Sequence, residues 1–356
     1  MTRLLGGGVF FLLLVLALLE LGARAFLYVQ YGEPLSFYRR FGYDRAPLTG
    51  FEMRPNQAPA DSVTLKTRYA TNGDGFRGTR EYGVKAPGEF RVAVVGESSA
   101  FGYGASDDGA TIAARLETRL DARHATVINA GNPAYMSYQV LARTQLRVLP
   151  REPDVVVVYS GWNDYMDADY PGWYPNHFHG EEIFFSMDSW DAIITDQNKD
   201  TRLAPLRHSA ALILVRKALG VWRDRQHVHL AVVPGTRVRR LDIGAARMAI
   251  VSTTLERNLR ALGGALRAQH VTPVYCTLMS RSGVYEDIRA AANAVIRRVA
   301  ADLGAPLVDV EGLAGTPAPA DYFNPDDGYH LSDAGNAFIA AAVGDALAAL
   351  PAPATP

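Results

Sequence analysis

The sequence contains a single cysteine, Cys276, among its 356 residues. One thiol can form neither an intramolecular disulfide nor a cysteine-based metal site. The residue stands in the apolar run 271–278, which is typical of a buried strand. Because a cysteine nucleophile needs an exposed, electropositive setting, we interpret Cys276 as a small core residue.

The sequence also has no large excess of positive or negative charge. The chain has 36 Lys and Arg against 37 Asp and Glu, a formal net charge of -1. This balance gives no electrostatic reason to expect nucleic acid as a partner.

Patterns for cofactors and metals are weak or absent. The run GESSAFGYG (residues 96–104) fits neither G-x-G-x-x-G nor the P-loop spacing with its lysine. The run NHFHGEE places His177, His179, Glu181 and Glu182 close together, but without a predicted geometry we interpret them as polar surface residues. We therefore expect no cofactor and no metal.

One long hydrophobic run is present, at the N-terminus. Residues 4–19 are all apolar or glycine, and the run resumes after Glu20 to about Val29. A helix of about 20 apolar residues can span a bilayer. We therefore predict a transmembrane signal-anchor over residues 1–29. A cleaved signal peptide is the alternative, because Ala23-Arg24-Ala25 resembles an A-x-A cleavage site.

The rest of the chain divides into four parts by pattern. Residues 30–89 carry Asn-Gly and Asp-Gly turn signals and predict an extended or hairpin lead-in segment. A main domain is predicted over residues 90–350, interrupted by an aromatic cap insertion at 165–247, which we expect to be partly helical around residues 206–224. Residues 351–356 form a Pro/Ala tail.

Within the main domain, short β-branched runs alternate with segments of helical periodicity. Strands are predicted at residues 91–96, 126–131, 154–161, 271–278 and 306–310, and helices at 107–123, 137–149, 253–269, 286–304 and 331–350. Continuous apolar strands alternating with helices indicate a parallel sheet covered on both faces. The expected fold class is α/β, a three-layer α/β/α domain with about five parallel strands.

Polar residues follow several of these strands, where ligands of open parallel sheets bind. Ser98 follows the first strand, Gly131 the second and Asn163 the third, while Asp327 and His330 precede the last helix. A serine hydroxyl attacks a carbonyl only when a base removes its proton, and a carboxylate must orient that base. We therefore predict Ser98 as nucleophile, His330 as base and Asp327 as its acidic partner, with Ser99 and Asp326 as rival candidates.

The same strand ends offer donors for an oxyanion. The backbone N–H groups of Ser98 and Gly131 and the side-chain amide of Asn163 are suitable, one from each of three neighbouring loops. An aromatic group in the insertion is expected either to line an acyl or sugar site or to pack the cap. It comprises Tyr165, Tyr170, Trp173, Tyr174, Phe178, Phe184 and Phe185.

The runs GESSAFG, INAGNP, GWND and DDGYH closely resemble the four conserved blocks of SGNH/GDSL hydrolases. The resemblance covers roughly residues 91–350 and implies a flavodoxin-like fold, a triad of Ser98, Asp327 and His330, and oxyanion donors at Gly131 and Asn163. Glu97 departs from the family pattern, because it stands where the family has Asp; the carboxylate is kept, but the hydrogen bonding of the turn is expected to change.

The resemblance implies esterase activity, and TNGDGFRG with the N-terminal hydrophobic run is similar to bacterial membrane-anchored members. We therefore expect a serine esterase that removes an acyl group, such as acetyl, from an envelope glycan or lipid-like ester. Its location would be the bacterial inner membrane, single-pass, with the catalytic domain periplasmic. The alternatives are an O-acyltransferase acting on an envelope polysaccharide beside a membrane acyl-donor protein, and a non-catalytic envelope scaffold module.

Overall fold

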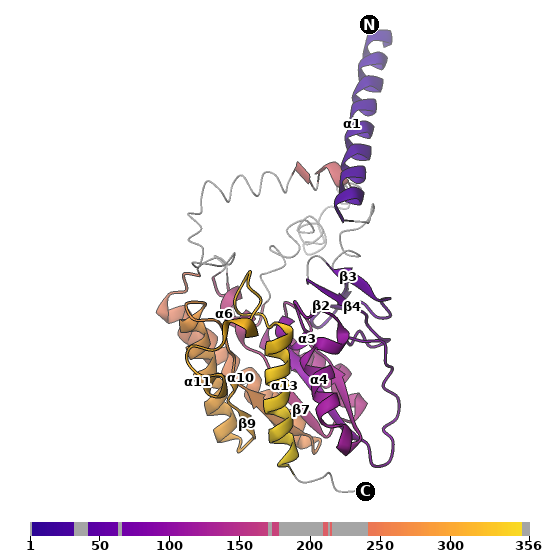
Figure 1. Ribbon diagram of the computed structural model, residues 1–356. Helices are drawn as coiled ribbons and strands as arrows, with labels where there is room; N and C mark the ends of the chain where they lie inside the picture. Colours follow the sequence, from indigo (N-terminus) through magenta and orange to yellow (C-terminus); the bar gives the residue numbers. More distant parts are fainter. Residues whose placement is uncertain are drawn as a thin grey trace. The chain divides into compact units, whose positions relative to one another are not determined.

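A computed structural model describes residues 2–31, 42–62, 66–169, 173–177, 209–212, 214–215 and 241–350 (Figure 1). Most of the predicted cap lies outside the described residues, as does the tail 351–356. Of the helix expected at 206–224, only residues 209–212 and 214–215 are described, and residues 210–212 and 214–215 are helical. The chain divides into two compact units, one of residues 1–43 and 179–230 and the other of residues 44–178 and 231–356.

The first unit contains one long helix, α1 (Thr2–Tyr31). Its stretch Gly7–Phe26 is long and apolar enough to cross a membrane. Its large apolar side chains are exposed, for example Phe10 at 69% and Leu13 at 60%. A signal sequence near the N-terminus has the same properties, so the helix agrees with both N-terminal alternatives.

A five-stranded sheet forms the centre of the second unit. Its strands lie in the order β6-β5-β7-β8-β9, and every neighbouring pair is parallel. Their bounds are β5 (Phe90–Gly96), β6 (Ala125–Asn129), β7 (Val155–Tyr159), β8 (Thr272–Cys276) and β9 (Leu307–Val308). β5 and β7 are buried along their whole length, because helices cover both faces. The predicted parallel five-stranded α/β fold is therefore confirmed.

Helices pack against the sheet in two groups. α4 (Ile112–Arg119) packs against α13 (Asp333–Ala348) (Figure 1). α10 (Ala245–Ala268) packs against both α5 (Ser137–Arg143) and α11 (Glu286–Asp302). The two groups form the outer layers of the α/β/α arrangement.

Several predicted elements have different bounds in the structure, and three of them have a clear local cause or a large shift. The helix expected at 107–123 is divided into η1 (Asp108–Ala110), α4 and η2 (Asp121–Arg123), because the side chains of Asp107 and Thr111 each cap a separate helix start. α10 begins at Ala245 rather than at residue 253. The last strand is only two residues long, because Asp309 accepts a hydrogen bond from the Gly312 N–H and starts α12 (Val310–Ala314).

The segment before the sheet forms two strand pairs. β1 (Tyr43–Ala46) pairs with β2 (Gly50–Met53), and β3 (Ala60–Ser62) pairs antiparallel with β4 (Thr67–Tyr69).

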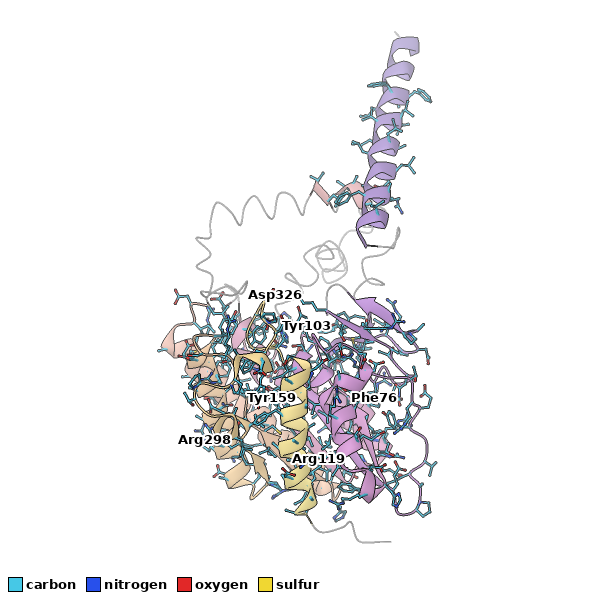
Figure 2. All side chains as sticks on the ribbon, in the orientation of Figure 1. Phe76, Tyr103, Arg119, Tyr159, Arg298 and Asp326 are labelled. Carbon is cyan, nitrogen blue, oxygen red and sulfur yellow. The ribbon has the colours of Figure 1, made fainter. Side chains whose placement is uncertain are left out.

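Arg77 joins the chain just after these pairs to the sheet. Its backbone N–H donates to Asn129 O of β6 at 3.0 Å. Its buried guanidinium donates to the carbonyl oxygens of Phe101 and Gly102 and pairs with Asp108. The lead-in is thereby held against the end of the sheet at which Tyr103 and Asp326 lie in Figure 2.

Candidate active site

The turn after β5 presents Ser98. Gly96 has φ +151°, and a Cβ built there would lie 2.0 Å from the Tyr159 carbonyl oxygen, so the close approach of β5 and β7 requires glycine. Ser98 is the first residue of α3 (Ser98–Phe101), a single turn that ends because Gly102 is left-handed. The side chain of Ser98 is therefore half-exposed at the carboxyl edge of the sheet.

The three predicted triad residues lie together. Ser98 Oγ is 2.7 Å from His330 Nε2, and His330 Nδ1 is 3.0 Å from Asp327 Oδ2. The other carboxylate oxygen of Asp327 accepts the backbone N–H of His330 at 2.9 Å and that of Tyr329 at 3.1 Å. The loop thus fixes the carboxylate and the ring relative to each other before any substrate binds.

Asp327 is buried, which by itself favours its neutral form. The hydrogen bond and the charge of His330, together with the two backbone N–H donors, outweigh this effect and lower the pKa of Asp327 below its ordinary value. A carboxylate that stays ionised can hold the Nδ1–H tautomer and stabilise the imidazolium.

The rival candidates lie elsewhere. The hydroxyl of Ser99 is buried and has no hydrogen-bond partner in the described part of the chain. Asp326 pairs with Lys66, whose Nζ lies 2.6 Å from Asp326 Oδ2. The geometry therefore singles out Ser98 and Asp327.

Gly131 follows β6 and lies directly against the turn of Ser98. A Cβ at Gly131 would be 2.2 Å from Phe101 N, a distance that no side chain tolerates. Its backbone N–H donates to Asn129 Oδ1 at 3.3 Å, a long and therefore weak hydrogen bond.

Asn163 follows β7 in α6 (Trp162–Asp167). Its side-chain nitrogen donates one N–H to Tyr135 O at 2.9 Å, and its backbone N–H donates to Glu97 Oε2 at 3.1 Å. A primary amide carries two N–H groups, so the second donor of Asn163 is left for another acceptor.

Glu97 has a positioning role that sequence reasoning did not identify, although its departure from the family pattern was a signal. One carboxylate oxygen accepts the Ser160 hydroxyl at 3.0 Å and the Gly161 N–H at 2.6 Å, and the other accepts the Asn163 N–H. The carboxylate therefore joins the turn of Ser98 to the loop of Asn163. Burial, with the nearby Asp164, raises the pKa of Glu97 to about 8 against these hydrogen bonds.

Asp164 is also buried and acts on the neighbouring loop. It accepts the Ser137 hydroxyl at 2.6 Å and the Ser137 N–H at 3.0 Å at the start of α5. Burial raises the pKa of Asp164 to about 6.

Aromatic rings surround His330. The ring of Tyr103 stacks on the imidazole, and Tyr329 contacts it at a centroid distance of 4.2 Å. Tyr329 also packs against Trp162 and Tyr285. Nothing in the sequence indicated Tyr103, because its contact depends on how the two loops meet.

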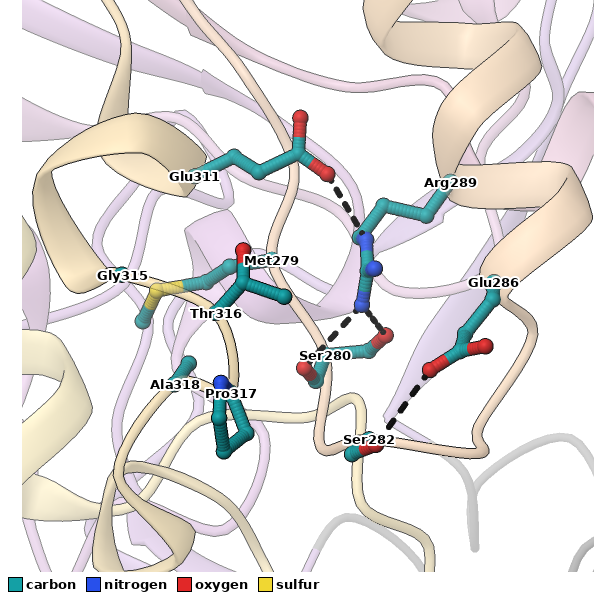
Figure 3. A pocket seen from close by; sticks show the side chains of 10 residues that line it. All are labelled: Met279, Ser280, Ser282, Glu286, Arg289, Glu311, Gly315, Thr316, Pro317 and Ala318. Atoms are coloured by element: carbon teal, nitrogen blue, oxygen red, sulfur yellow. Dashed lines mark hydrogen bonds and ion pairs between the residues drawn. The ribbon is translucent and has the colours of Figure 1, made fainter.

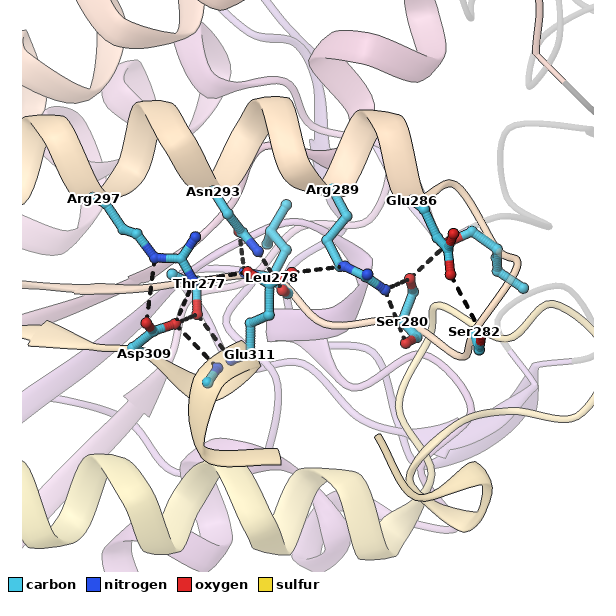
Figure 4. Close-up of polar contacts among 12 residues, drawn as sticks. Thr277, Leu278, Ser280, Ser282, Glu286, Arg289, Asn293, Arg297, Asp309 and Glu311 are labelled. Atoms are coloured by element: carbon cyan, nitrogen blue, oxygen red, sulfur yellow. Dashed lines mark hydrogen bonds and ion pairs between the residues drawn. The ribbon is translucent and has the colours of Figure 1, made fainter. Parts of the chain in front are cut away.

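An ionic network supports the loop that carries His330. Arg289 of α11 pairs with Glu311 and donates to Ser280 after β8 (Figure 3). Arg297 pairs with Asp309 and Glu311 in the same row (Figure 4). These contacts hold residues 277–281 in place, and there the Arg281 N–H donates to Gly328 O, between Asp327 and His330, at 2.8 Å.

The small pocket in Figure 3 lies beside this network and is lined by Met279, Ser280, Ser282, Glu286, Arg289, Glu311 and residues 315–318.

The residues that the structure describes contain no group of three His, Cys, Asp or Glu side chains arranged for a metal ion. His179, Glu181 and Glu182 lie outside them, whereas the described His177 stacks on Tyr174. Cys276 is fully buried, and burial raises the pKa of its thiol to about 12.

Comparison with known proteins gives one family match. A model described as the GDSL-like lipase/acylhydrolase family matches residues 94–338. No curated protein matches the chain.

Several solved structures are similar to this chain at low identity. A lipase/acylhydrolase from Enterococcus faecalis has 16% identity and a TM-score of 0.42, covering 72% of this chain and 93% of its own. The esterase EstA from Pseudoalteromonas sp. has 13% identity and a TM-score of 0.42, with 73% and 97% covered. The acetyl xylan esterase AlAXEase has 17% identity and a TM-score of 0.40, with 72% and 99% covered. At these values the similarities carry no argument beyond the family match.

Proposed function

Because the chain belongs to the GDSL-like lipase/acylhydrolase family and is an ester hydrolase, we propose that Ser98, His330 and Asp327 are its catalytic triad. The supporting observation is the unbroken chain of contacts from Ser98 Oγ to His330 Nε2 and from His330 Nδ1 to Asp327. The family match argues against the alternative of a non-catalytic scaffold module.

In the proposed reaction, Ser98 Oγ attacks the ester carbonyl while His330 Nε2 takes the hydroxyl proton. The tetrahedral intermediate collapses, the bond to the leaving alcohol breaks, and His330 returns the proton to that alcohol. Water then attacks the acyl-Ser98 ester, giving its proton to His330, and the acid leaves as Ser98 regains a proton. The lowered pKa of Asp327 keeps a negative charge beside the imidazolium in both steps.

The oxyanion is proposed to accept three hydrogen bonds, from the Ser98 and Gly131 N–H groups and the second amide N–H of Asn163. Gly131 now donates over 3.3 Å to a neutral amide oxygen, and a charged oxygen is a stronger acceptor. The loss of one such donor typically costs about 2.7–4 kcal/mol of transition-state stabilisation.

For the substrate, we propose an acyl ester, such as an acetyl ester, on an envelope glycan or lipid-like molecule. The aromatic rings of Tyr103 and Tyr329 beside the triad fit a substrate with apolar faces. The apolar α1 supports a single-pass anchor in a bacterial inner membrane, with the catalytic unit in the periplasm.

The direct test uses the full chain in detergent and a fluorophosphonate probe, with p-nitrophenyl acyl esters and acetylated sugars as substrates. We expect labelling and turnover by the parent chain and neither by Ser98→Ala. Ser99→Ala is the matched control and should retain both. Equal labelling of Ser98→Ala and parent would refute the triad.

The same assay addresses acyl transfer. When a glycan acceptor is added, hydrolysis predicts free acid as the product. An acylated acceptor formed at the expense of free acid would identify an O-acyltransferase using the same serine.

A further inference from the structure

The single acidic residue of the apolar stretch Gly7–Phe26 is Glu20. It lies six residues before Phe26, so at 1.5 Å per residue its backbone is about 9 Å inside the end of the apolar stretch. An ionisable side chain at such a depth is unfavourable unless it has a partner.

Glu20 has partners from a segment almost two hundred residues away in the sequence. Its carboxylate accepts the Ser209 hydroxyl at 2.8 Å, the Ala210 N–H at 2.9 Å and the Ala211 N–H at 3.1 Å. On α1 itself, Arg24 pairs with it at 2.7 Å. The negative charge of Glu20 is therefore compensated by Arg24 of α1 and by the donors of residues 209–211.

The contact provides hydrogen-bond partners both for the Glu20 carboxylate and for the start of the helical segment. Residues 210–212 and 214–215 are helical, and the first N–H groups of a helix have no intrahelical acceptor. In a bilayer, such groups must be satisfied within the protein. The carboxylate of Glu20 supplies the acceptor, and the start of the helical segment supplies the donors that the carboxylate needs.

The residues that follow this start are apolar, and two of them, Leu212 and Val215, are exposed. The sequence of residues 210–215 is AALILV, and Leu212 and Val215 are 38% and 55% exposed. The exposed apolar side chains of α1, such as Leu16 and Leu19, belong to the same compact unit. A surface of this kind fits acyl chains rather than water.

We propose that the segment of residues 209–212 and 214–215 enters the bilayer beside α1, docked through Glu20, and contacts lipid acyl chains through Leu212 and Val215. This inference rests on the membrane placement of α1 but not on the triad. The segment belongs to the stretch between α6, which carries Asn163, and α10.

The test uses the full chain in phosphatidylcholine vesicles, with an environment-sensitive thiol dye. Cys276 is buried and gives a low background. Three variants, each with one added cysteine, are compared: Leu212→Cys in the segment, Leu13→Cys in α1 and Leu313→Cys on α12, where Leu313 is 63% exposed. Brominated acyl chains quench a dye only in their vicinity.

We expect quenching at Leu212→Cys and Leu13→Cys, and none at Leu313→Cys. Adding Glu20→Ala should reduce the quenching at Leu212→Cys to the level of Leu313→Cys and leave Leu13→Cys unchanged, while Glu20→Gln, which keeps an acceptor oxygen, should retain part of it.

Quenching at Leu13→Cys without quenching at Leu212→Cys would overturn the docking and leave the anchor intact. So would quenching at Leu212→Cys that is independent of Glu20. If Leu13→Cys is unquenched, both the membrane placement and this inference are wrong, whereas fluorophosphonate labelling of Ser98 reports on the triad separately.

Discussion

The ring of Tyr103 stacks on the imidazole of His330, with centroids 3.9 Å apart and planes inclined by 21°. The backbone N–H of Tyr103 donates to the carbonyl oxygen of Ser98 at 2.8 Å. One residue therefore contacts both the backbone of the proposed nucleophile and the ring of the proposed base, and it sets the distance between their loops.

Two variants of Tyr103 should distinguish the effect of its ring on kcat from the effect of its hydroxyl group. We expect Tyr103→Leu to lower kcat by up to about tenfold, because stacking of this kind is worth roughly 0.5–1.5 kcal/mol. Tyr103→Phe keeps the ring and should retain kcat within about twofold. Phe338→Leu, which removes the stacked pair of Phe338 with Tyr322, is the control and should leave kcat unchanged. Equal losses in the Leu and Phe variants of Tyr103 would contradict a role for the ring.

The two neighbouring aspartates should differ sharply in their effect on turnover. Asp327→Asn removes the charge that orients His330, and a loss of about 10⁴-fold in kcat is expected for such a change. Asp326→Asn only removes a half-exposed pair with Lys66, worth about 0–1 kcal/mol, so kcat should stay near the parent value. Steady-state kinetics on one p-nitrophenyl ester compare the two, and the reverse order of effects would assign the acid to Asp326.

A methyl group at Gly131 should displace the turn of Ser98. The added Cβ would meet Phe101 N at 2.2 Å and Ala100 C at 2.6 Å, both backbone atoms that cannot turn away. We expect Gly131→Ala to lower kcat by at least about 10²-fold, the effect of one lost oxyanion donor.

The matched control is Gly264→Ala in α10, where an added Cβ has no atom within 4 Å. Alanine favours the helix over glycine, so this variant should keep its activity and gain up to about 1 kcal/mol in the free energy of unfolding. If Gly131→Ala retains parental kcat, the close packing of Gly131 has no bearing on the reaction.

Glu97 should make the free energy of unfolding decrease as the pH rises, because folding raises the pKa of its carboxyl group. Its pKa rises from 4.5 to about 8 on folding, so the folded chain binds more protons than the unfolded chain in this range. The contribution of Glu97 to stability is therefore full below about pH 4.5 and is lost as the pH rises through about 8.

Glu97→Gln cannot titrate, so the decrease in the free energy of unfolding between these pH values should be smaller in this variant. Asp164 keeps its own part of the dependence, since its pKa is raised to about 6. Urea unfolding in detergent across this pH range measures the slope. Glu286→Gln is the control. The pKa of this exposed carboxylate is lowered, so its removal should change the pH dependence of stability only at acid pH. A slope unchanged in Glu97→Gln would show that Glu97 does not titrate there.

The sequence alone was sufficient for the parallel α/β sheet and for the strand ends at which Ser98, Gly131 and Asn163 stand. Apolar strands and helical periodicity are local signals, and parallel strands place their carboxyl ends at one edge. The pair Asp327 and His330 was also within reach, because a spacing of three residues on one loop brings a carboxylate to an imidazole.

The tertiary structure decided the contacts between residues far apart in the chain. It alone shows Tyr103 on His330, Asp326 on Lys66, and Glu97 between the turn of Ser98 and the loop of Asn163. Each of these contacts depends on how two loops pack and on which charges are buried together. The periodicity of the sequence predicts neither of these. For the same reason the sequence marks Glu20 only as an interruption of an apolar helix, whereas the folded chain gives it partners at Ser209 and Ala210.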